Sequence, residues 1–558
     1  MDTLARVRDS LIIFLLFAIH IAITPWNNLE AVVLPKFFLL ISLGSVVLAL
    51  STPSFFDFAR KRNSFLILAS TMSLLVSINV FINDYSLDER LFGIYGRNLG
   101  AITYFFLFLL IIPSFYFSDR KLGLFLNSFF TTSFLISVYF FLQFWGKDPA
   151  NWQYVFEKIP NTTLGNPNFV GSYFGIVTVV AFGATVLKIH KSSYVRILNI
   201  THSFLAGFII YKSKAEQGVV IAAILGLVLV AGLYLFKKES KDRHFSPRRL
   251  LAYTFLSFFF VTIVVFLYQN QLISSLGART DYWMNAFKQT MSSPFFGQGF
   301  DSFANRSMQF RSSRFPQFSD SPHNLILELS SSSGLPIAIG YISLQLMVLV
   351  KILRNWRILL DQKGSTVFLL ILIWVGFHLQ SLINPGTLPF LSIGFVLTGI
   401  LFSQFNFSTS PENAVNMTGK KNQVKVTLRP STNEKLITIF NMCFFIPVST
   451  FIAFAPLGKD SAFRNGIEKG DGEKIIEVVN RWPYNSGLSL QAAHILKDNE
   501  FKELAARVLN KSLDRNRDDY FVWKLLLDIS SESSNGPEIL RNLNRLNPLN
   551  RQDFEMQP

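Results

Sequence analysis

The sequence contains a single cysteine, Cys443, which stands in an apolar run. One cysteine excludes an intramolecular disulfide and a thiolate cage for a metal ion. Charge is scarce as well, because charged residues make up 16% of the chain and hydrophobic residues 50%. This balance excludes an ordinary soluble domain and is typical of a chain that lies largely within a membrane.

Motifs for metals, nucleotides and dinucleotides are also missing. Asp281, Asp301, Asp320 and Glu328 share one polar interval, but they form neither a DxD motif nor a cluster with histidine. The sequence has no P-loop and no glycine-rich dinucleotide fingerprint. We therefore expect no metal and no cofactor. The energy of any reaction would come from an activated substrate rather than from ATP.

Apolar runs long enough to cross a membrane recur along most of the chain. The first follows Arg6 and Arg8, and no small-residue cleavage site comes after it, so it predicts a retained helix rather than a signal peptide. We expect an all-α, polytopic membrane protein with about 12 to 13 transmembrane helices. The predicted spans are 11–25, 37–52, 64–83, 99–117, 122–145, 169–188, 197–211, 218–236, 250–268, 334–353, 366–384, 388–405 and 435–457.

The net charge of +16 is distributed along the chain in a pattern that predicts orientation. Basic clusters fall in alternate loops, and short loops rich in Lys and Arg stay on the cytoplasmic side of a membrane. This pattern predicts a cytoplasmic N-terminus and an extracytoplasmic loop over 269–333. Because the loops account for the positive charge, we expect no nucleic-acid partner.

The composition also divides the chain into parts. Residues 1–405 are expected to form the membrane domain, 406–434 a polar cytoplasmic linker, and 435–457 the last transmembrane helix. The tail, 458–558, would then share the extracytoplasmic side with the 269–333 loop. Its apolar residues recur at helical spacing with an interval of about 33 residues, which resembles a tetratricopeptide array. An unrelated helical domain is the alternative.

One polar interval, from Ala278 to Gly340, lies between two apolar runs and holds a histidine, His323. The other six histidines fall in predicted spans, in cytoplasmic loops or in the tail. Histidine suits general acid–base chemistry near neutral pH, so His323 is the candidate base. The alternative is that His323 caps or orients the helix that follows it.

Arginines in the same interval suggest an anionic substrate. The planar guanidinium stays charged and grips phosphate with two parallel hydrogen bonds. Arg279 is the best candidate because it stands beside the membrane, and Arg314 is a second candidate because it is near His323. Arg306 and Arg311 are expected to be ordinary loop charges. The alternative for all four is a surface that faces lipid headgroups.

Three other predicted outer loops offer polar side chains. Lys214, after the 197–211 run, would point into the same site or extend along the membrane interface. Arg97 would join the anion site or anchor at headgroups. Asn166 and Asn168 stand before a span, where their amides would donate hydrogen bonds to a substrate or only begin a helix.

In their order and topology these motifs resemble the O-antigen ligase superfamily. The run Ser321-Pro322-His323-Asn324 is similar to that family's loop-to-helix signature. The other similar motifs are Gly334-Leu335-Pro336, Arg279 with Trp283, Pro294 to Gly299, Gly165 to Asn168, and Pro35-Lys36. The resemblance covers roughly residues 10–405.

The resemblance implies a GT-C-type glycosyltransferase of the bacterial cytoplasmic membrane. Its donor would be a glycan on polyprenyl (undecaprenyl) diphosphate, and its acceptor a hydroxyl of a lipid, a glycan or a protein. The reaction would be metal-independent and would invert the sugar configuration, with His323 as the base. The resemblance and the loop arguments together give Arg279, Lys214, Arg314 and Arg97 as diphosphate-binding residues, supported by Asn324, Asn166, Asn168 and Glu328.

One departure from the family concerns the second phosphate contact. Many members carry a Ser-Arg-Gly-like motif where this chain has Ser213-Lys214-Ala215. Lysine keeps the charge but lacks the planar fork of arginine. The tail lies outside the family's common core, and we expect it to dock a partner protein or an acceptor.

Other functions remain open from the sequence. Within the superfamily, a polysaccharide polymerase shares the donor site and differs in its acceptor. A transporter of polysaccharide or lipid would be expected to carry acidic residues in its spans, and these spans contain essentially none. A non-catalytic scaffold for glycan assembly is the remaining alternative.

Overall fold

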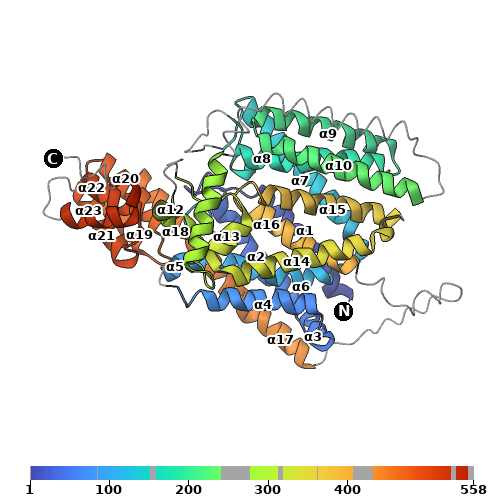
Figure 1. Ribbon diagram of the computed structural model, residues 1–558, viewed down its shortest axis with the longest axis horizontal. Coiled ribbons are helices and arrows are strands. Elements are labelled where there is room, and N and C mark those ends of the chain that lie inside the picture. The colour runs from blue at the N-terminus through green and yellow to red at the C-terminus, as the bar shows by residue number, and fades with distance from the viewer. Residues whose placement is uncertain are drawn as a thin grey trace.

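The computed structural model describes residues 2–83, 86–150, 152, 159–239, 277–311, 318–360, 362–405, 432–529 and 536–550. Across these ranges every regular element is a helix (Figure 1). The predicted all-α fold is therefore confirmed for the described residues. The predicted span 250–268, Arg314 and most of the 406–434 linker lie outside them, so the number of spans stays a prediction.

The long helices coincide with the predicted apolar runs, and eight helices of the described ranges are long and apolar enough to cross a membrane. A polytopic membrane protein is thus confirmed. The helices of the membrane bundle include these eight and others that are shorter or less apolar. Their bounds are α1 Asp2–Ile21, α2 Val33–Leu50, α4 Ser64–Asn79, α6 Ala101–Phe115, α7 Leu122–Phe144, α8 Pro167–Val186, α9 Ser193–Ser213, α10 Glu216–Glu239, α14 Leu335–Arg354, α15 Gln362–Ser381, α16 Leu388–Gln404 and α18 Ile446–Glu468.

Shorter helices connect or extend the long ones. They are α3 Thr52–Lys61, α5 Leu87–Phe92, η1 Asp119–Lys121, η2 Thr162–Leu164, α12 Phe303–Phe310, α13 Leu325–Ser333, η3 Trp356–Leu360, α17 Thr432–Phe440 and η6 Asn441–Phe445. Residues 277–292 are helical as well. The chain runs through α17, η6 and α18 as one rod, and the predicted end of the last span at residue 457 is not a break in that helix.

Polar caps set the helix starts that matter for the site. Asn166 accepts a hydrogen bond from the Asn168 amide and begins α8, with Pro167 in the first turn. Asn324 accepts from the Leu327 amide and begins α13. Asparagine caps and a first-turn proline satisfy or remove amides that the helix leaves unpaired. The two asparagine motifs of the sequence therefore have a clear local role.

The helices pack around α16, nearly all of whose side chains are buried. Close contacts between small residues hold α8 against α10. A Cβ built on Gly175 would lie 2.4 Å from the carbonyl oxygen of Gly218, and one on Gly218 would lie 2.3 Å from that of Gly171. Small residues spaced in this way let helix backbones approach closely in a membrane, where packing rather than water drives association.

The two ends of the bundle differ. At one end Arg8 donates to Ser54 over 3.0 Å, and Asp9 accepts from the Ser118 amide over 2.9 Å, which joins α1 to α3 and to the start of η1. The basic clusters at 60–62 and 120–121 lie here, so we call it the basic end. Residues 277–311 and 318–333 and the described helices of the tail lie at the opposite end, the loop end (Figure 1). Which end faces the cytoplasm stays a prediction.

The tail is a series of short helices, each packed on the next, that extends from α18 (Figure 1). Its helices are α19 Gly472–Asn480, α20 Ser486–Asp498, α21 Lys502–Arg515, α22 Tyr520–Ile529 and α23 Gly536–Leu546. They share a second hydrophobic core separate from that of the membrane bundle. The tetratricopeptide-like assignment stays a prediction.

The glycine contact predicts a stability effect. Gly175→Ala should lower the free energy of unfolding by about 1–3 kcal/mol, because the new methyl group forces α8 and α10 apart. The measurement is the thermal unfolding midpoint in detergent. Gly207→Ala is the matched control, since a Cβ there meets no atom within 4 Å. Equal midpoints for the two variants would contradict close packing at Gly175.

Candidate functional site

A cavity of about 390 Å³ opens at the loop end. Its walls come from the segments around residues 25–33, 96–97, 161–169, 320–323 and 385–389. Sequence-predicted site residues His323, Arg97 and Asn166 line it together. Segments that are far apart in the chain therefore form one polar hollow at the rim of the membrane bundle.

His323 stands on the turn before α13, with its backbone in the left-handed region at φ +53°. Few residues other than glycine adopt this conformation, and histidine does so more readily than most. The His323 amide donates to Ser321 Oγ over 3.0 Å, and the imidazole stacks on Tyr282 with ring centroids 5.5 Å apart. These contacts fix the direction of the ring.

The hydrogen bonds of His323 also fix its tautomer. Nδ1 lies 3.0 Å from the carbonyl oxygen of Ser321, which can only accept, so Nδ1 carries the proton. In the neutral ring Nε2 then holds a free electron pair. No hydrogen-bond partner of Nε2 occurs among the residues that the structure describes. The arrangement leaves Nε2 able to accept a proton.

The electrostatic surroundings keep this imidazole neutral. Burial lowers the pKa of His323 below its ordinary value, and the hydrogen bond to Ser321 and the charge of Asp320 oppose that shift. Arg279 and Arg97 lower the pKa further, because their positive charges disfavour an imidazolium. A neutral ring at physiological pH is the form that a general base needs.

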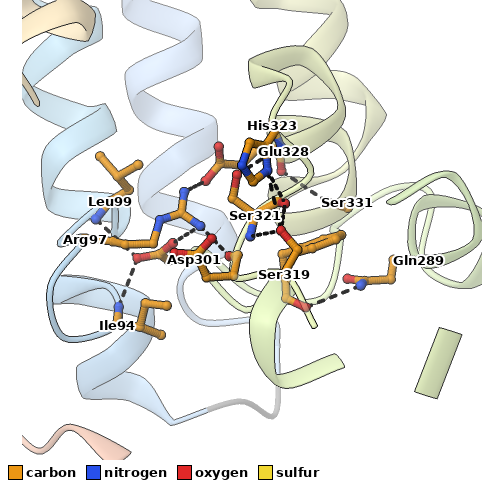
Figure 2. A network of polar contacts seen from close by, with 12 residues as sticks. Ile94, Arg97, Leu99, Gln289, Asp301, Ser319, Ser321, His323, Glu328 and Ser331 are labelled. Carbon is orange, nitrogen blue, oxygen red and sulfur yellow. Dashed lines mark hydrogen bonds and ion pairs between the residues drawn. The ribbon is translucent and has the colours of Figure 1, made fainter. Parts of the chain in front are cut away.

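Arg97 is bound between two buried carboxylates (Figure 2). Its guanidinium pairs with Glu328, lies 3.5 Å from Asp301, and donates to the Asp320 carbonyl over 2.6 Å. Asp301 is held in turn by the amides of Ile94 and Leu99. Arg97 thus joins the 94–100 segment to α13 and to the turn that carries His323.

One arginine does not fully neutralise two buried acids. Burial raises the pKa of Glu328 to about 7, although Arg97 acts in the opposite direction. Burial likewise raises the pKa of Asp301. Burial also disfavours the charge of Arg97, but the two carboxylates outweigh that effect and raise its pKa. The cluster therefore holds a permanent cation and at least one acid that can take up a proton near neutral pH.

Arg279 stands on the 277–292 helix, which also carries Tyr282, the ring that stacks on His323. Its side chain is buried, and Nε donates to the Ile383 carbonyl over 2.9 Å. The charge of Glu216, at the start of α10, also acts on it. Arg279 is therefore close enough to influence His323 electrostatically, but it is not part of the cavity wall.

The remaining predicted residues are more dispersed. Lys214 is exposed at the left-handed turn between α9 and α10 and does not line the cavity. Asn168 is exposed on the first turn of α8. Asn324 donates to the Leu382 carbonyl over 3.2 Å, which ties the start of α13 to the end of α15. The roles predicted for these residues in substrate binding stay predictions.

Several cavity residues were not predicted as site residues. Glu30 caps α2 by accepting from the amides of Val32 and Val33, and burial raises its pKa. Lys36 is fully buried and donates to the carbonyls of Ala22 and Thr163 at 2.6 and 2.7 Å. An acid before an apolar run and a lysine within it are weak sequence patterns, so neither marks a cavity.

The described residues contain no group of three or more His, Cys, Asp or Glu side chains that could hold a metal ion. The cavity instead collects hydrogen-bonding groups of both charges around one imidazole. Such a set can bind a polar, partly anionic molecule and take a proton from it. Metal independence itself stays a prediction.

Comparison with known proteins agrees with the sequence motifs. Residues 176–342 match a family model described as O-antigen ligase. The matched region contains Lys214, Arg279 and the His323 turn with Asn324, and it ends within α14. The comparison with curated proteins finds no match. The match supports the predicted superfamily over residues 176–342 and does not extend to the tail.

The Arg97 cluster predicts a stability effect. Arg97→Ala leaves two carboxylates buried without their cation, and removing one partner of a buried ion pair costs about 3–5 kcal/mol. Arg481→Ala is the matched control, because its pair with Glu477 is exposed and should be worth less than about 1 kcal/mol. Thermal midpoints in detergent compare the two variants. A loss for Arg97→Ala no larger than that of the control would show that its charge is not needed for the fold.

Proposed function

We propose, from the O-antigen ligase domain at residues 176–342, that this membrane protein is a glycosyltransferase. It moves a glycan from a polyprenyl diphosphate to an acceptor hydroxyl and inverts the configuration of the sugar. The observation that carries the proposal is His323, a neutral imidazole whose Nδ1 is bound by the Ser321 carbonyl and which lines the cavity.

Transfer of the glycan to a hydroxyl requires one proton acceptor. His323 Nε2 takes the proton of the acceptor hydroxyl, and that oxygen attacks the anomeric carbon of the donor sugar. The bond between the anomeric carbon and the phosphate oxygen breaks, and its electron pair leaves with the polyprenyl diphosphate. The products are the glycosylated acceptor, the lipid diphosphate and an imidazolium that later loses its proton to water.

A diphosphate needs positive charge nearby, and two arginines supply it. Arg97 lines the cavity together with His323, and the charge of Arg279 acts on the imidazole. Arg97 is paired with Glu328, the acid whose pKa is raised to about 7. When Glu328 is protonated, more of the arginine's positive potential reaches the leaving group. Lys214 and Arg314 remain candidate contacts to the outer part of the donor.

Loss of the imidazole should abolish transfer. His323→Ala in proteoliposomes should lower the rate by about 10²–10⁴-fold, the usual contribution of a general base. The assay supplies a lipid-diphosphate glycan and candidate acceptors in the presence of a chelator, and products are sized. A ladder on the lipid carrier would identify a polymerase, and a single shift of a lipid or protein would identify a ligase.

The control for this variant is His494→Ala, because His494 is exposed on the tail. Transfer at the normal rate by His323→Ala would exclude the imidazole as the base. Loss of transfer in the chelator by the unchanged protein would exclude metal independence.

The pH dependence should follow the lowered pKa of His323. A base must be neutral to act, so the rate falls as the pH drops through that pKa, and the acid limb should lie below about 6.5. The measurement is kcat/KM between about pH 4.5 and 8. The variant Glu328→Gln tells which of the two groups causes the fall in kcat/KM at low pH. If His323 causes it, the fall persists in this variant. If the fall disappears, the titrating group is the carboxyl group of Glu328.

A further inference from the structure

The tail contacts three segments that bring charged residues to the cavity. These are 25–32 with Glu30, 88–98 with Arg97, and the described residues 303–311 and 318–323 with Asp320 and His323. The family match does not include the tail, and the sequence suggested only that it docks a partner protein or an acceptor. Its contacts point to a different role.

The first contact is made by the end of α18, the helix that leads into the tail. Asp460 Oδ2 accepts from the amides of Leu29 and Glu30 at 2.8 and 3.3 Å. Asn28 donates to the Leu457 carbonyl over 2.9 Å. Arg464 donates to the carbonyls of Pro25 and Asn28 at 2.6 and 3.1 Å. The whole 25–30 segment is therefore bonded to one helix.

Asp460 also reaches a second segment. Its Oδ1 accepts from the hydroxyl of Tyr95, two residues before Arg97. Asp460 is 1% exposed. This buried carboxylate therefore accepts from the segment of Glu30 with one oxygen and from the segment of Arg97 with the other. Among the described residues it is the side chain that bonds both cavity segments from the tail side.

The start of α20 adds contacts to the same segment. Asn485 donates to the Gly93 carbonyl over 3.0 Å and accepts from the Tyr95 amide over 3.2 Å. Ser486 donates to the buried Glu89 through its amide and its hydroxyl, at 2.7 and 2.6 Å. The residues around Arg97 are thus held from two tail helices.

The third segment meets the far end of the tail. Arg306 pairs with Asp518 at 2.6 Å, and Arg311 donates to Asn547 over 3.0 Å. Phe318 packs edge-to-face on Phe521 with centroids 4.7 Å apart. Two residues further along lies Asp320, whose carbonyl accepts from Arg97.

We propose that Asp460 is a positioning residue of the cavity and that the tail braces the site rather than serving only to dock a partner. By accepting from both segments, Asp460 sets the distance between Glu30 and Arg97 on the wall that faces His323. This inference rests on the proposed glycosyl transfer for its effect on rate. Whether Asp460 holds the two segments in place can be tested without measuring glycan transfer.

The size of the effect follows from geometry. Segments 25–32 and 94–100 are irregular backbone, so hydrogen bonds rather than a helix ladder hold them in place. An asparagine at 460 keeps the shape of the side chain but offers one accepting oxygen in place of two. A displacement of about 1 Å in a site that positions reactants can cost up to about a hundredfold in rate.

The test compares Asp460→Asn with the unchanged full-length protein in nanodiscs. Hydrogen–deuterium exchange should rise in 25–32 and 94–98 and stay unchanged in the tail helices. In the transfer assay kcat should fall about tenfold while KM for the donor changes less, because the geometry around His323 is altered. The matched control is Glu473→Gln, whose partner Arg507 lies within the tail, and it should change neither readout.

A milder variant covers the case in which Asp460→Asn fails to fold. Tyr95→Phe removes only the bond to Oδ1 and should give a smaller change of the same kind. Combined with Asp460→Asn, it should add less than the sum of the two single changes, because both variants alter contacts of the same side chain.

Unchanged exchange in 25–32 and 94–98, or full kcat in Asp460→Asn, would overturn the inference. If the unchanged protein transfers no glycan to any acceptor, the proposed function fails. The exchange comparison then still decides whether Asp460 holds the two segments.

Discussion

The cost of burying a charge without a partner organises the loop end of this protein. Asp301, Glu328, Lys36 and Asp460 are nearly inaccessible, and the Arg97 side chain is 9% exposed. Each is bound by groups from another part of the chain. An unpaired charge at these positions would cost several kcal/mol. These pairings therefore hold the segments between the helices in place. That arrangement encloses the cavity.

Much of the membrane architecture could be predicted, because apolar length is a strong constraint in a bilayer. The runs that became α2, α8, α14 and α16 stand out without any knowledge of contacts. His323, which lines the cavity, could be singled out as a candidate by comparing the positions of the histidines along the chain. Its tautomer could not, since that depends on the local bond to the Ser321 carbonyl.

Long-range pairing explains what sequence reasoning missed. Arg97 was expected to bind phosphate, and its partner Glu328 lies 231 residues away. Asp460 bonds the amide of Leu29 across 431 residues. No periodicity or spacing relates such positions, because each bond arises only after the helices have packed. From the sequence, the tail could therefore be described only by its own composition. Its relation to the site depends on contacts with the membrane part, which only the folded structure shows.

The distance along the chain between Leu29 and Asp460 also has a consequence for how the protein is made. The ribosome delivers the 25–32 segment near the beginning of synthesis and α18 near its end. During that time Glu30 and Arg97 lie on segments whose bonds to the tail cannot yet form. Long-range contacts of this kind are the slowest to form. A chain cut short before α18 would therefore insert its earlier helices into the membrane without the bonds of Asp460 that hold the segments of Glu30 and Arg97.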